Sequence, residues 1–353
     1  MLEIKALKKC YTTGDGQVVA LDGVSLAISA NEFAVILGPS GSGKSTLLHV
    51  VAGLLPADGG EVIIRDNVAT HAPVSERRVA MVLQNLGLYP HKTVMQNVEY
   101  PMLVAKAKGD ERKRCALDLL RLLKISDLAD RKPRTLSGGQ LQRVALARAL
   151  AKKADLFLLD EPFSDLDAQI RYELRNELKL LHVSRGLTTV LVTHDQEDAM
   201  ALADRIALMH KGKIIEVGSP RRLYEQPRTV FAATFMGRPP MTVFRVSLAG
   251  RCPYFDGSRL PIDIADTTIP SIEGDVLLGL RPEDISVVMR AGEWCVELIQ
   301  AAGGFCYVHL KWARLRMVCR SDSQTELRIG DRVALKVMAN AHFFDPQTEE
   351  RIK

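Results

Sequence analysis

The most constraining feature of this chain is a glycine-rich segment that begins at residue 38. It consists of Gly38, Pro39, Ser40, Gly41, Ser42, Gly43, Lys44, Ser45 and Thr46. The run fits the spacing G-x-x-x-x-G-K-S/T, in which glycines allow backbone N–H groups to turn inward around a phosphate. An apolar run, Val35–Leu37, precedes it, and a helical pattern, Ser45–Ala52, follows it. A chance glycine turn would not require both flanks, so we predict a strand, a phosphate-binding loop and a helix in that order.

Two side chains of this loop have the chemistry that phosphoryl transfer needs. The Lys44 ammonium can reach the β- and γ-phosphates of a nucleotide, and the Ser45 hydroxyl can ligate Mg²⁺. The helix that follows adds the positive end of its dipole. The segment therefore predicts a site for nucleotide phosphates together with Mg²⁺.

A second motif is an apolar strand that ends in two acids. Leu156–Leu159 is followed by Asp160 and Glu161. Strand ends at the carboxyl edge of a parallel sheet face the ligand, where Asp160 is suited to Mg²⁺ and Glu161 to polarising the attacking water. The alternative is a pair of solvated carboxylates that open a turn before Pro162.

A third motif is a short polar string before a helical pattern. It consists of Ser137, Gly138, Gly139 and Gln140. A serine hydroxyl and unblocked glycine N–H groups at the start of a helix form a second anion site. The alternative is an ordinary helix N-cap after a loop.

With these three motifs in this order and a histidine downstream, the chain resembles the ABC transporter ATPases over about residues 1–235. The resemblance implies that Gln84 links Mg²⁺ and water to the contact with a membrane subunit, and that His194 holds the γ-phosphate. It implies that Tyr11 stacks on adenine and that Ser164–Asp167 is the loop between two ATPase subunits. Without the resemblance, Gln84 would be a polar strand terminator, His194 structural and Tyr11 a core residue.

Alternating buried-strand and helix patterns predict an α/β domain with a mainly parallel sheet over residues 1–235. Leucines at helical spacing predict a helical subdomain at about 85–154. Glycine and adjacent prolines in Phe235–Met241 indicate a boundary. Beyond it, over 236–353, short strands with turn signals predict a small all-β, OB-like barrel. We expect its strands at Thr242–Leu248, Val276–Leu280, Cys295–Ile299, Cys306–Leu310, Leu315–Cys319 and Val333–Val337.

Subfamily signals resemble the maltose-type carbohydrate importers, whose ATPases carry a C-terminal OB-like (TOBE) regulatory domain. They occur at Leu88–His91, Thr193–Met200, Gly279–Glu283 and Ala341–Pro346. This chain departs from that pattern at Leu83, where phenylalanine is usual, and at Lys92, where methionine is usual. It also has Asp165 where the family more often has asparagine.

The resemblance implies ATP hydrolysis coupled to import of a solute, with a sugar or sugar phosphate as the favoured cargo. ATP and Mg²⁺ are the implied cofactors. The phosphate-binding loop and the Ser137 string must approach one γ-phosphate from opposite sides, so two chains arranged head to tail, as a homodimer, complete two sites. The other implied partners are two transmembrane permease subunits and an extracytoplasmic solute-binding protein, and the implied location is peripheral, on the cytoplasmic face of the inner membrane.

Three alternatives stay open. Importers of polyamines, sulfate or ferric iron share this layout. Non-transport ABC proteins of DNA repair or translation are a second class, although repair types insert a very long coiled coil and translation types usually carry two ATPase units. A regulatory nucleotide-binding module without turnover is the third, and the presence of Glu161 and His194 argues against it.

Bulk properties agree with this interpretation. A formal net charge of +5 over 353 residues does not demand nucleic acid as a partner. The start of the chain lacks a signal-peptide pattern, and no apolar run approaches the ~20 residues of a membrane span. The six cysteines form no C-x-x-C pair, which is typical of a reducing compartment.

Overall fold

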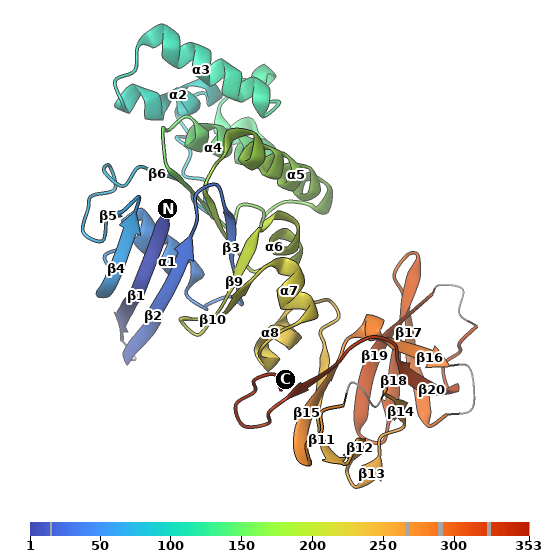
Figure 1. Ribbon diagram of the computed structural model, residues 1–353. Coiled ribbons are helices and arrows are strands. Elements are labelled where there is room, and N and C mark those ends of the chain that lie inside the picture. The colour runs from blue at the N-terminus through green and yellow to red at the C-terminus, as the bar shows by residue number, and fades with distance from the viewer. Residues whose placement is uncertain (15, 266–268, 289–291, 323–325, 353) are drawn as a thin grey trace. The chain divides into compact units, whose positions relative to one another are not determined.

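The structure is a computed structural model that describes residues 1–14, 16–265, 269–288, 292–322 and 326–352. The chain divides into two compact units, Met1–Pro220 and Arg221–Lys353 (Figure 1). Within the described residues, no helix combines the length and the apolar character needed to span a membrane.

The first unit combines two sheets with helices. Its strands are β1 (Leu2–Thr13), β2 (Gly16–Ile28), β3 (Phe33–Leu37), β4 (Gly59–Ile64), β5 (Asn67–Val68), β6 (Val79–Val82), β7 (Leu156–Asp160), β8 (Thr189–Thr193), β9 (Arg205–His210) and β10 (Lys213–Gly218). Its helices are α1 (Lys44–Ala52), α2 (Val94–Val104), α3 (Gly109–Leu122), η1 (Ser126–Leu128), η2 (Pro133–Thr135), α4 (Gly138–Leu150), α5 (Ala168–Arg185) and α6 (Gln196–Leu202).

The central sheet has the strand order β10-β9-β3-β8-β7-β6, and all of its pairings are parallel except that of β10 with β9. Every residue of β3, β7 and β8 is buried, as continuous apolar runs predict for parallel strands covered on both faces. Helix α1 contacts β7 and β8, and α6 contacts β3 and β8. The predicted α/β fold with a mainly parallel sheet is confirmed.

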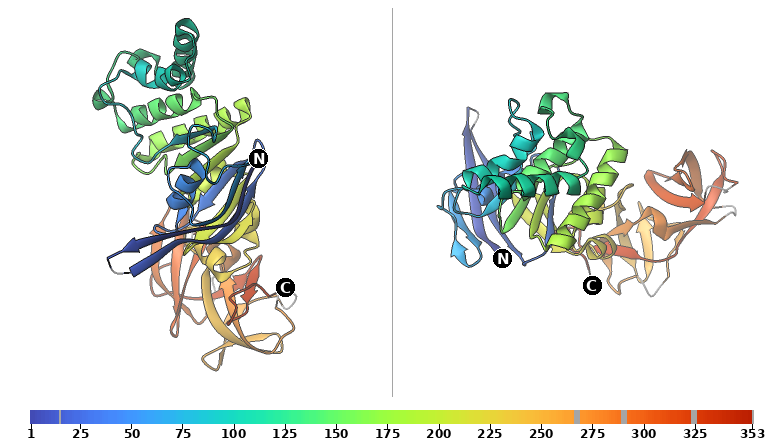
Figure 2. Two further views of the ribbon diagram at one scale, coloured as in Figure 1. Left: turned by 90° about the vertical axis from the view of Figure 1, so that its left-hand side faces the viewer. Right: turned by 90° about the horizontal axis from the view of Figure 1, so that it is seen from above.

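A second, antiparallel sheet with the order β2-β1-β4-β5 was not predicted. Figure 2 shows β1 and β2 side by side as a long hairpin. One hydrophobic core joins this sheet, α1 and the central sheet. In α1 the side chains of Leu47, Leu48, Val50 and Val51 are almost completely buried, and each contributes about 1.5–3 kcal/mol of hydrophobic stabilisation. The helix that follows the glycine-rich loop is therefore held from both sides.

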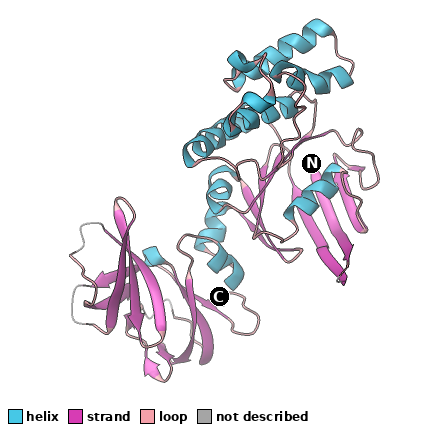
Figure 3. Ribbon diagram, turned by 180° about the vertical axis from the view of Figure 1, so that it is seen from behind, coloured by secondary structure: helices cyan, strands magenta, loops and turns pink. Residues whose placement is uncertain are grey.

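The predicted helical subdomain contains α2, α3 and α4. These helices contact one another, and α4 also contacts α5 (Figure 3). Helix α2 starts with a capping box, because the Thr93 side chain accepts from the Gln96 N–H while the Gln96 side chain accepts from the Thr93 N–H.

The second unit consists mainly of strands. They are β11 (Thr242–Ala249), β12 (Cys252–Phe255), β13 (Ser258–Arg259), β14 (Ile262–Asp263), β15 (Gly274–Leu280), β16 (Ile285–Val288), β17 (Trp294–Ala301), β18 (Phe305–Trp312), β19 (Leu315–Asp322), β20 (Arg332–Val337) and β21 (Ala341–Phe344). Its helices are α7 (Pro220–Glu225), which begins one residue before it, α8 (Val230–Phe235) and η4 (Pro282–Asp284).

These strands form two sheets with a shared core. Their orders are β13-β12-β11-β15-β21 and β14-β20-β17-β18-β19, with β16 paired to β20. Buried and exposed residues alternate along β11, and the core includes Val246 of the first sheet with Val308 and Leu310 of the second. All six predicted strands are present, and the β-rich unit has the barrel-like character that the sequence predicted.

Helices α7 and α8 pack with the β-rich unit. The Arg281 guanidinium donates to the carbonyl oxygens of Tyr224, at 2.6 and 3.1 Å, and of Met236, at 2.6 Å. The Val230 N–H donates to the Glu349 carbonyl at 3.0 Å. The division of the chain into compact units therefore falls near Pro220, and the domain boundary after residue 235 stays a prediction.

Candidate active site

The glycine-rich loop connects the end of β3 to the start of α1. Gly41 and Gly43 have φ angles of 77° and 102°, in the left-handed region that favours glycine. A Cβ at Gly43 would lie 2.3 Å from the Ala20 carbonyl oxygen, and one at Gly38 would lie 2.1 Å from the Met209 carbonyl oxygen. The glycines therefore allow the loop both its turn and its close approach to neighbouring backbone.

Lys44, the first residue of α1, is only 4% exposed. Its Nζ donates to the Pro39 carbonyl at 3.0 Å, within the same loop. Burial lowers the pKa of Lys44, against the opposing effect of the Glu161 and Asp160 carboxylates. The ammonium thus lies in the field of both acids that the sequence assigned to the site.

Asp160, at the end of β7, contacts two residues of α1. The Ser45 hydroxyl donates to Asp160 Oδ1 at 2.8 Å, and His49 Nε2 lies 3.2 Å from Asp160 Oδ2. The carboxylate is 2% exposed. The structure therefore brings together Ser45 and Asp160, two of the three residues predicted to hold Mg²⁺.

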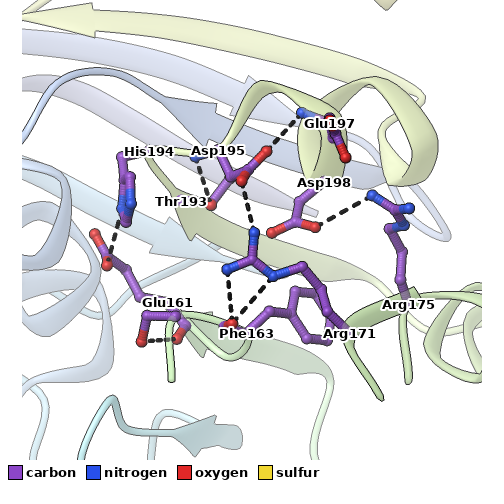
Figure 4. Close-up of polar contacts among 10 residues, drawn as sticks. Glu161, Phe163, Arg171, Arg175, Thr193, His194, Asp195, Glu197 and Asp198 are labelled. Carbon is purple, nitrogen blue, oxygen red and sulfur yellow. Dashed lines mark hydrogen bonds and ion pairs between the residues drawn. The ribbon is translucent and has the colours of Figure 1, made fainter. Parts of the chain in front are cut away.

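Glu161 and His194 meet at the ends of neighbouring parallel strands. His194 Nδ1 lies 3.1 Å from Glu161 Oε2 (Figure 4). The pairing of Asp160 with Val192 aligns β7 with β8, and the Glu161 N–H donates to the Val192 carbonyl at 3.0 Å. The predicted water-polarising acid and the predicted phosphate-binding histidine are thus direct neighbours.

Gln84 lies just beyond β6 and is exposed. It lines a groove of about 250 Å³ that also contains Glu161, Gly138 and Asp165. Gln84 and Glu161, each predicted to contact water in the site, therefore line the same groove. The third predicted Mg²⁺ residue is placed beside the acid end of β7.

Ser137 is the N-cap of α4. Its Oγ accepts from the Gln140 N–H at 3.4 Å, and Gln140 Oε1 accepts from the Ser137 N–H at 3.0 Å. A Cβ at Gly139 would lie 2.6 Å from Ile170 Cγ2 of α5. The string therefore has a structural role as a capping box and as a close helix contact, beside its predicted role as an anion site.

Tyr11 lies on β1 and is half-buried. Its hydroxyl is 3.5 Å from the Thr46 hydroxyl, and the Lys9 ammonium lies 5.8 Å from the ring centroid. The predicted adenine-stacking residue is thus next to the last residue of the phosphate-binding loop.

Sequence reasoning missed several residues around the site. His49 could have been found, because it lies four residues after Ser45 and so shares its face of α1. Arg148 of α4 donates to the carbonyl oxygens of Leu86 and Gly87, at 2.7 and 2.6 Å. No local pattern links Arg148 to that loop, since more than sixty positions separate them.

The loop after Gln84, the residue that the family resemblance links to the contact with a membrane subunit, contains Leu86, Leu88 and Tyr89. All three are half-buried. The Tyr89 ring packs against Tyr100 with a centroid distance of 4.6 Å. Tyr89 therefore has a packing role within the first unit, whereas the contact with a membrane subunit stays a prediction.

Comparison with known proteins agrees with this geometry. A sequence profile of the family described as ABC transporter matches residues 21–164. The sn-glycerol-3-phosphate import ATP-binding protein UgpC 2 of Agrobacterium fabrum is 38% identical, and the alignment covers 100% of this chain and 94% of the relative. The xylose/arabinose import ATP-binding protein XacK of Haloferax volcanii is 38% identical over 100% of this chain and 95% of the relative.

A solved dimeric structure of a bacterial ABC transporter cassette is also similar. It is 37% identical, with a TM-score of 0.58, and the match covers 63% of this chain and 99% of the cassette. The same cassette in a post-hydrolysis state, bound to ADP and Pi, gives the same values. The 38% identity to the two import ATP-binding proteins, over the full length of this chain, shows the family. The chain belongs to the ABC transporter ATP-binding proteins and is an ATPase.

Proposed function

We propose that this chain hydrolyses ATP to energise import of a sugar or sugar phosphate across the cell membrane. The observation that carries the proposal is the convergence of Lys44, Ser45, Asp160, Glu161 and His194 at one edge of the central sheet. Full-length similarity to import ATP-binding proteins for sn-glycerol-3-phosphate and for xylose/arabinose supports the cargo class.

Each residue has a role that follows from its chemistry. Lys44 and the loop N–H groups bind the phosphates of ATP. Glu161 orients and polarises a water, and His194, whose Nδ1 contacts Glu161, holds the γ-phosphate side of the site. Tyr11 offers an aromatic face to adenine.

The donor set also fits Mg²⁺, which prefers oxygen ligands and is commonly bound by one or two carboxylates together with substrate phosphates. Ser45 and Asp160 are already in contact, and Gln84 lies in the groove that contains Glu161. We therefore assign Ser45, Asp160 and Gln84 to Mg²⁺. When bound, the ion neutralises phosphate charge.

The proposal includes a homodimer in which Ser137–Gln140 of one chain faces the ATP bound to Lys44 of the other. The dimeric form of the similar cassette supports this arrangement. Two permease subunits and an extracytoplasmic solute-binding protein complete the proposed transporter. The chain then acts as a peripheral subunit on the cytoplasmic face of the inner membrane.

The test is reconstitution of this chain with its permease and binding protein in liposomes. Sugars, sugar phosphates, polyamines, sulfate and ferric iron are each supplied with the binding protein. We expect stimulation of ATP hydrolysis, and uptake of radiolabelled cargo, with a member of the first two classes. Stimulation only by polyamine, sulfate or iron would contradict the cargo class but not the ATPase role.

A further inference from the structure

Two arginines of α5 lie one helical turn apart and face two acids at the start of α6 (Figure 4). Arg171 Nη1 donates to Asp195 Oδ2 at 2.6 Å, and Arg175 Nη1 lies 3.4 Å from Asp198 Oδ1. The two ion pairs join α5 to α6 in a similar way. They differ in what else each arginine binds.

Arg171 also binds the chain segment that follows β7. Its Nε and Nη2 donate to the Phe163 carbonyl oxygen at 3.2 and 2.9 Å. Phe163 lies two residues after Glu161, and Asp195 directly follows His194. One guanidinium is therefore bonded to both segments that carry the two proposed active-site groups.

Asp195 is a fixed anchor for this guanidinium. Its Oδ1 accepts from the Glu197 N–H at 2.8 Å, which caps α6, while its own N–H donates to the Thr193 hydroxyl at 3.0 Å. Its side chain is 13% exposed and that of Arg171 is 23% exposed. Charge-assisted hydrogen bonds in such a partly buried place are stronger and more directional than those of a surface ion pair.

The segment after β7 needs such support. Glu161 has a φ of 44°, in the left-handed region, and a non-glycine residue adopts this conformation only when its surroundings enforce it. The Ser164 hydroxyl donates to the Glu161 carbonyl oxygen at 3.2 Å. Arg171 binds the carbonyl oxygen of Phe163, which lies between these two residues in the chain. The contact of Glu161 with His194 thus depends on the distance between the segment that follows β7 and the segment that follows β8.

We infer that Arg171 is a positioning residue for ATP hydrolysis. The pairing of β7 with β8 brings Glu161 and His194 together. By binding the Phe163 carbonyl and the Asp195 carboxylate at once, Arg171 holds the two segments beyond the strand ends in that arrangement. Arg175, which pairs with Asp198 on the same two helices, joins the helices and makes no hydrogen bond to the segment after β7 within the part of the chain that the structure describes. This inference rests on the proposed roles of Glu161 and His194.

The experiment compares Arg171→Gln with the matched control Arg175→Gln in the purified full-length protein with ATP and Mg²⁺. Both substitutions remove one ion pair between α5 and α6. We expect Arg171→Gln to lower kcat by about tenfold or more while KM and ATP affinity stay within about twofold. Arg175→Gln should keep kcat within about twofold. It too should lower the unfolding temperature, because it leaves the buried Asp198 carboxylate without its ion-pair partner.

Asp195→Asn supplies a second measurement, because the amide oxygen still caps α6 while the charge that binds Arg171 is removed. If the two residues act as one unit, the double variant with Arg171→Gln should lose no more kcat than Arg171→Gln alone. Arg171→Lys keeps the charge but not the three-hydrogen-bond geometry, so it should recover only part of the rate. If Arg171→Gln does not fold, Arg171→Lys and the single variant Asp195→Asn decide the matter, since both should lower kcat while KM stays within about twofold of wild type.

An Arg171→Gln protein with wild-type kcat, or an equal loss of kcat in Arg175→Gln, would overturn the inference. Glu161→Gln and His194→Ala in the same assay separate it from the proposed roles. If those two variants lose turnover while Arg171→Gln keeps it, only the inference fails. If they hydrolyse ATP normally, the proposed roles fail first.

Discussion

The Ser45 hydroxyl donates a 2.8 Å hydrogen bond to Asp160, which joins the first turn of α1 to the end of β7. The two residues are separated by 115 positions in the chain. This contact links the phosphate-binding loop after β3 to the acid end of β7, although β8 lies between these two strands in the central sheet.

Removal of the Lys44 ammonium from the phosphate-binding loop should abolish ATP hydrolysis without loss of fold. Lys44→Ala takes away the charge that balances the phosphates, and we expect hydrolysis to fall by about a hundredfold or more. The Nζ makes one hydrogen bond to Pro39, so the circular dichroism spectrum should be unchanged. Near wild-type phosphate release by the folded variant would contradict the assignment.

Removal of the proposed base should trap a dimer. Glu161→Gln keeps the shape and hydrogen-bonding capacity of the side chain but not its charge, so hydrolysis should slow by on the order of a hundredfold while ATP still binds. We expect a dimer by light scattering with ATP and Mg²⁺. Adding Ser137→Arg should block it, because a bulky side chain would enter the partner's phosphate site.

Two outcomes would count against this mechanism. Normal hydrolysis by Glu161→Gln would remove the base assignment. An inactive variant that stays monomeric with saturating ATP, and that Ser137→Arg does not change, would remove the shared site for the isolated protein. Repeating the comparison on a chain truncated after Phe235 excludes a dimer held by the β-rich unit.

Gly38 lies so close to the backbone of Met209 that there is no room for a side chain at this position. In Gly38→Ala the new Cβ would lie 2.1 Å from the Met209 carbonyl oxygen, so the loop must shift. We expect a loss of about 1–3 kcal/mol of stability and a weaker affinity for ATP, measured by denaturant unfolding and fluorescent-nucleotide titration. Gly14→Ala, with open space around its Cβ, is the control. Equal behaviour of the two variants would show that the loop relaxes freely.

Asp198 should make stability depend on pH. Burial, together with the Asp195 and Glu197 charges and against Arg171 and Arg175, raises the pKa of Asp198 to about 6 from 3.8. The folded state therefore holds this proton more tightly than the unfolded state. Its contribution to stability is fully present below pH 3.8 and is lost as the pH rises through 6.

Asp198→Asn removes this dependence. The free energy of unfolding of the variant, relative to wild type, should rise by on the order of 2 kcal/mol between pH 4 and pH 7.5. A constant offset from the unpaired Arg175 would not alter that trend. Urea unfolding at a series of pH values measures it, and parallel curves for the two proteins would contradict the raised pKa.

The sequence by itself determined the features that are written in contiguous residues. The loop Gly38–Thr46, the buried run of β7 and the cap at Ser137 were predictable, because each depends on neighbouring positions and on a local period. Family resemblance added roles for Gln84 and His194, which single positions do not reveal. The alternation of buried and exposed residues along strands of the β-rich unit was predictable for the same reason.

Tertiary structure alone decided the rest. The sheet of β1 and β2 escaped prediction because register shifts interrupt its alternation. The contact of Glu161 with His194 follows from the adjacency of β7 and β8, and the bonds of Arg171 follow from the packing of α5 against α6. Such pairings depend on strand order and helix packing between segments far apart in the chain, and no local pattern encodes which segments will meet.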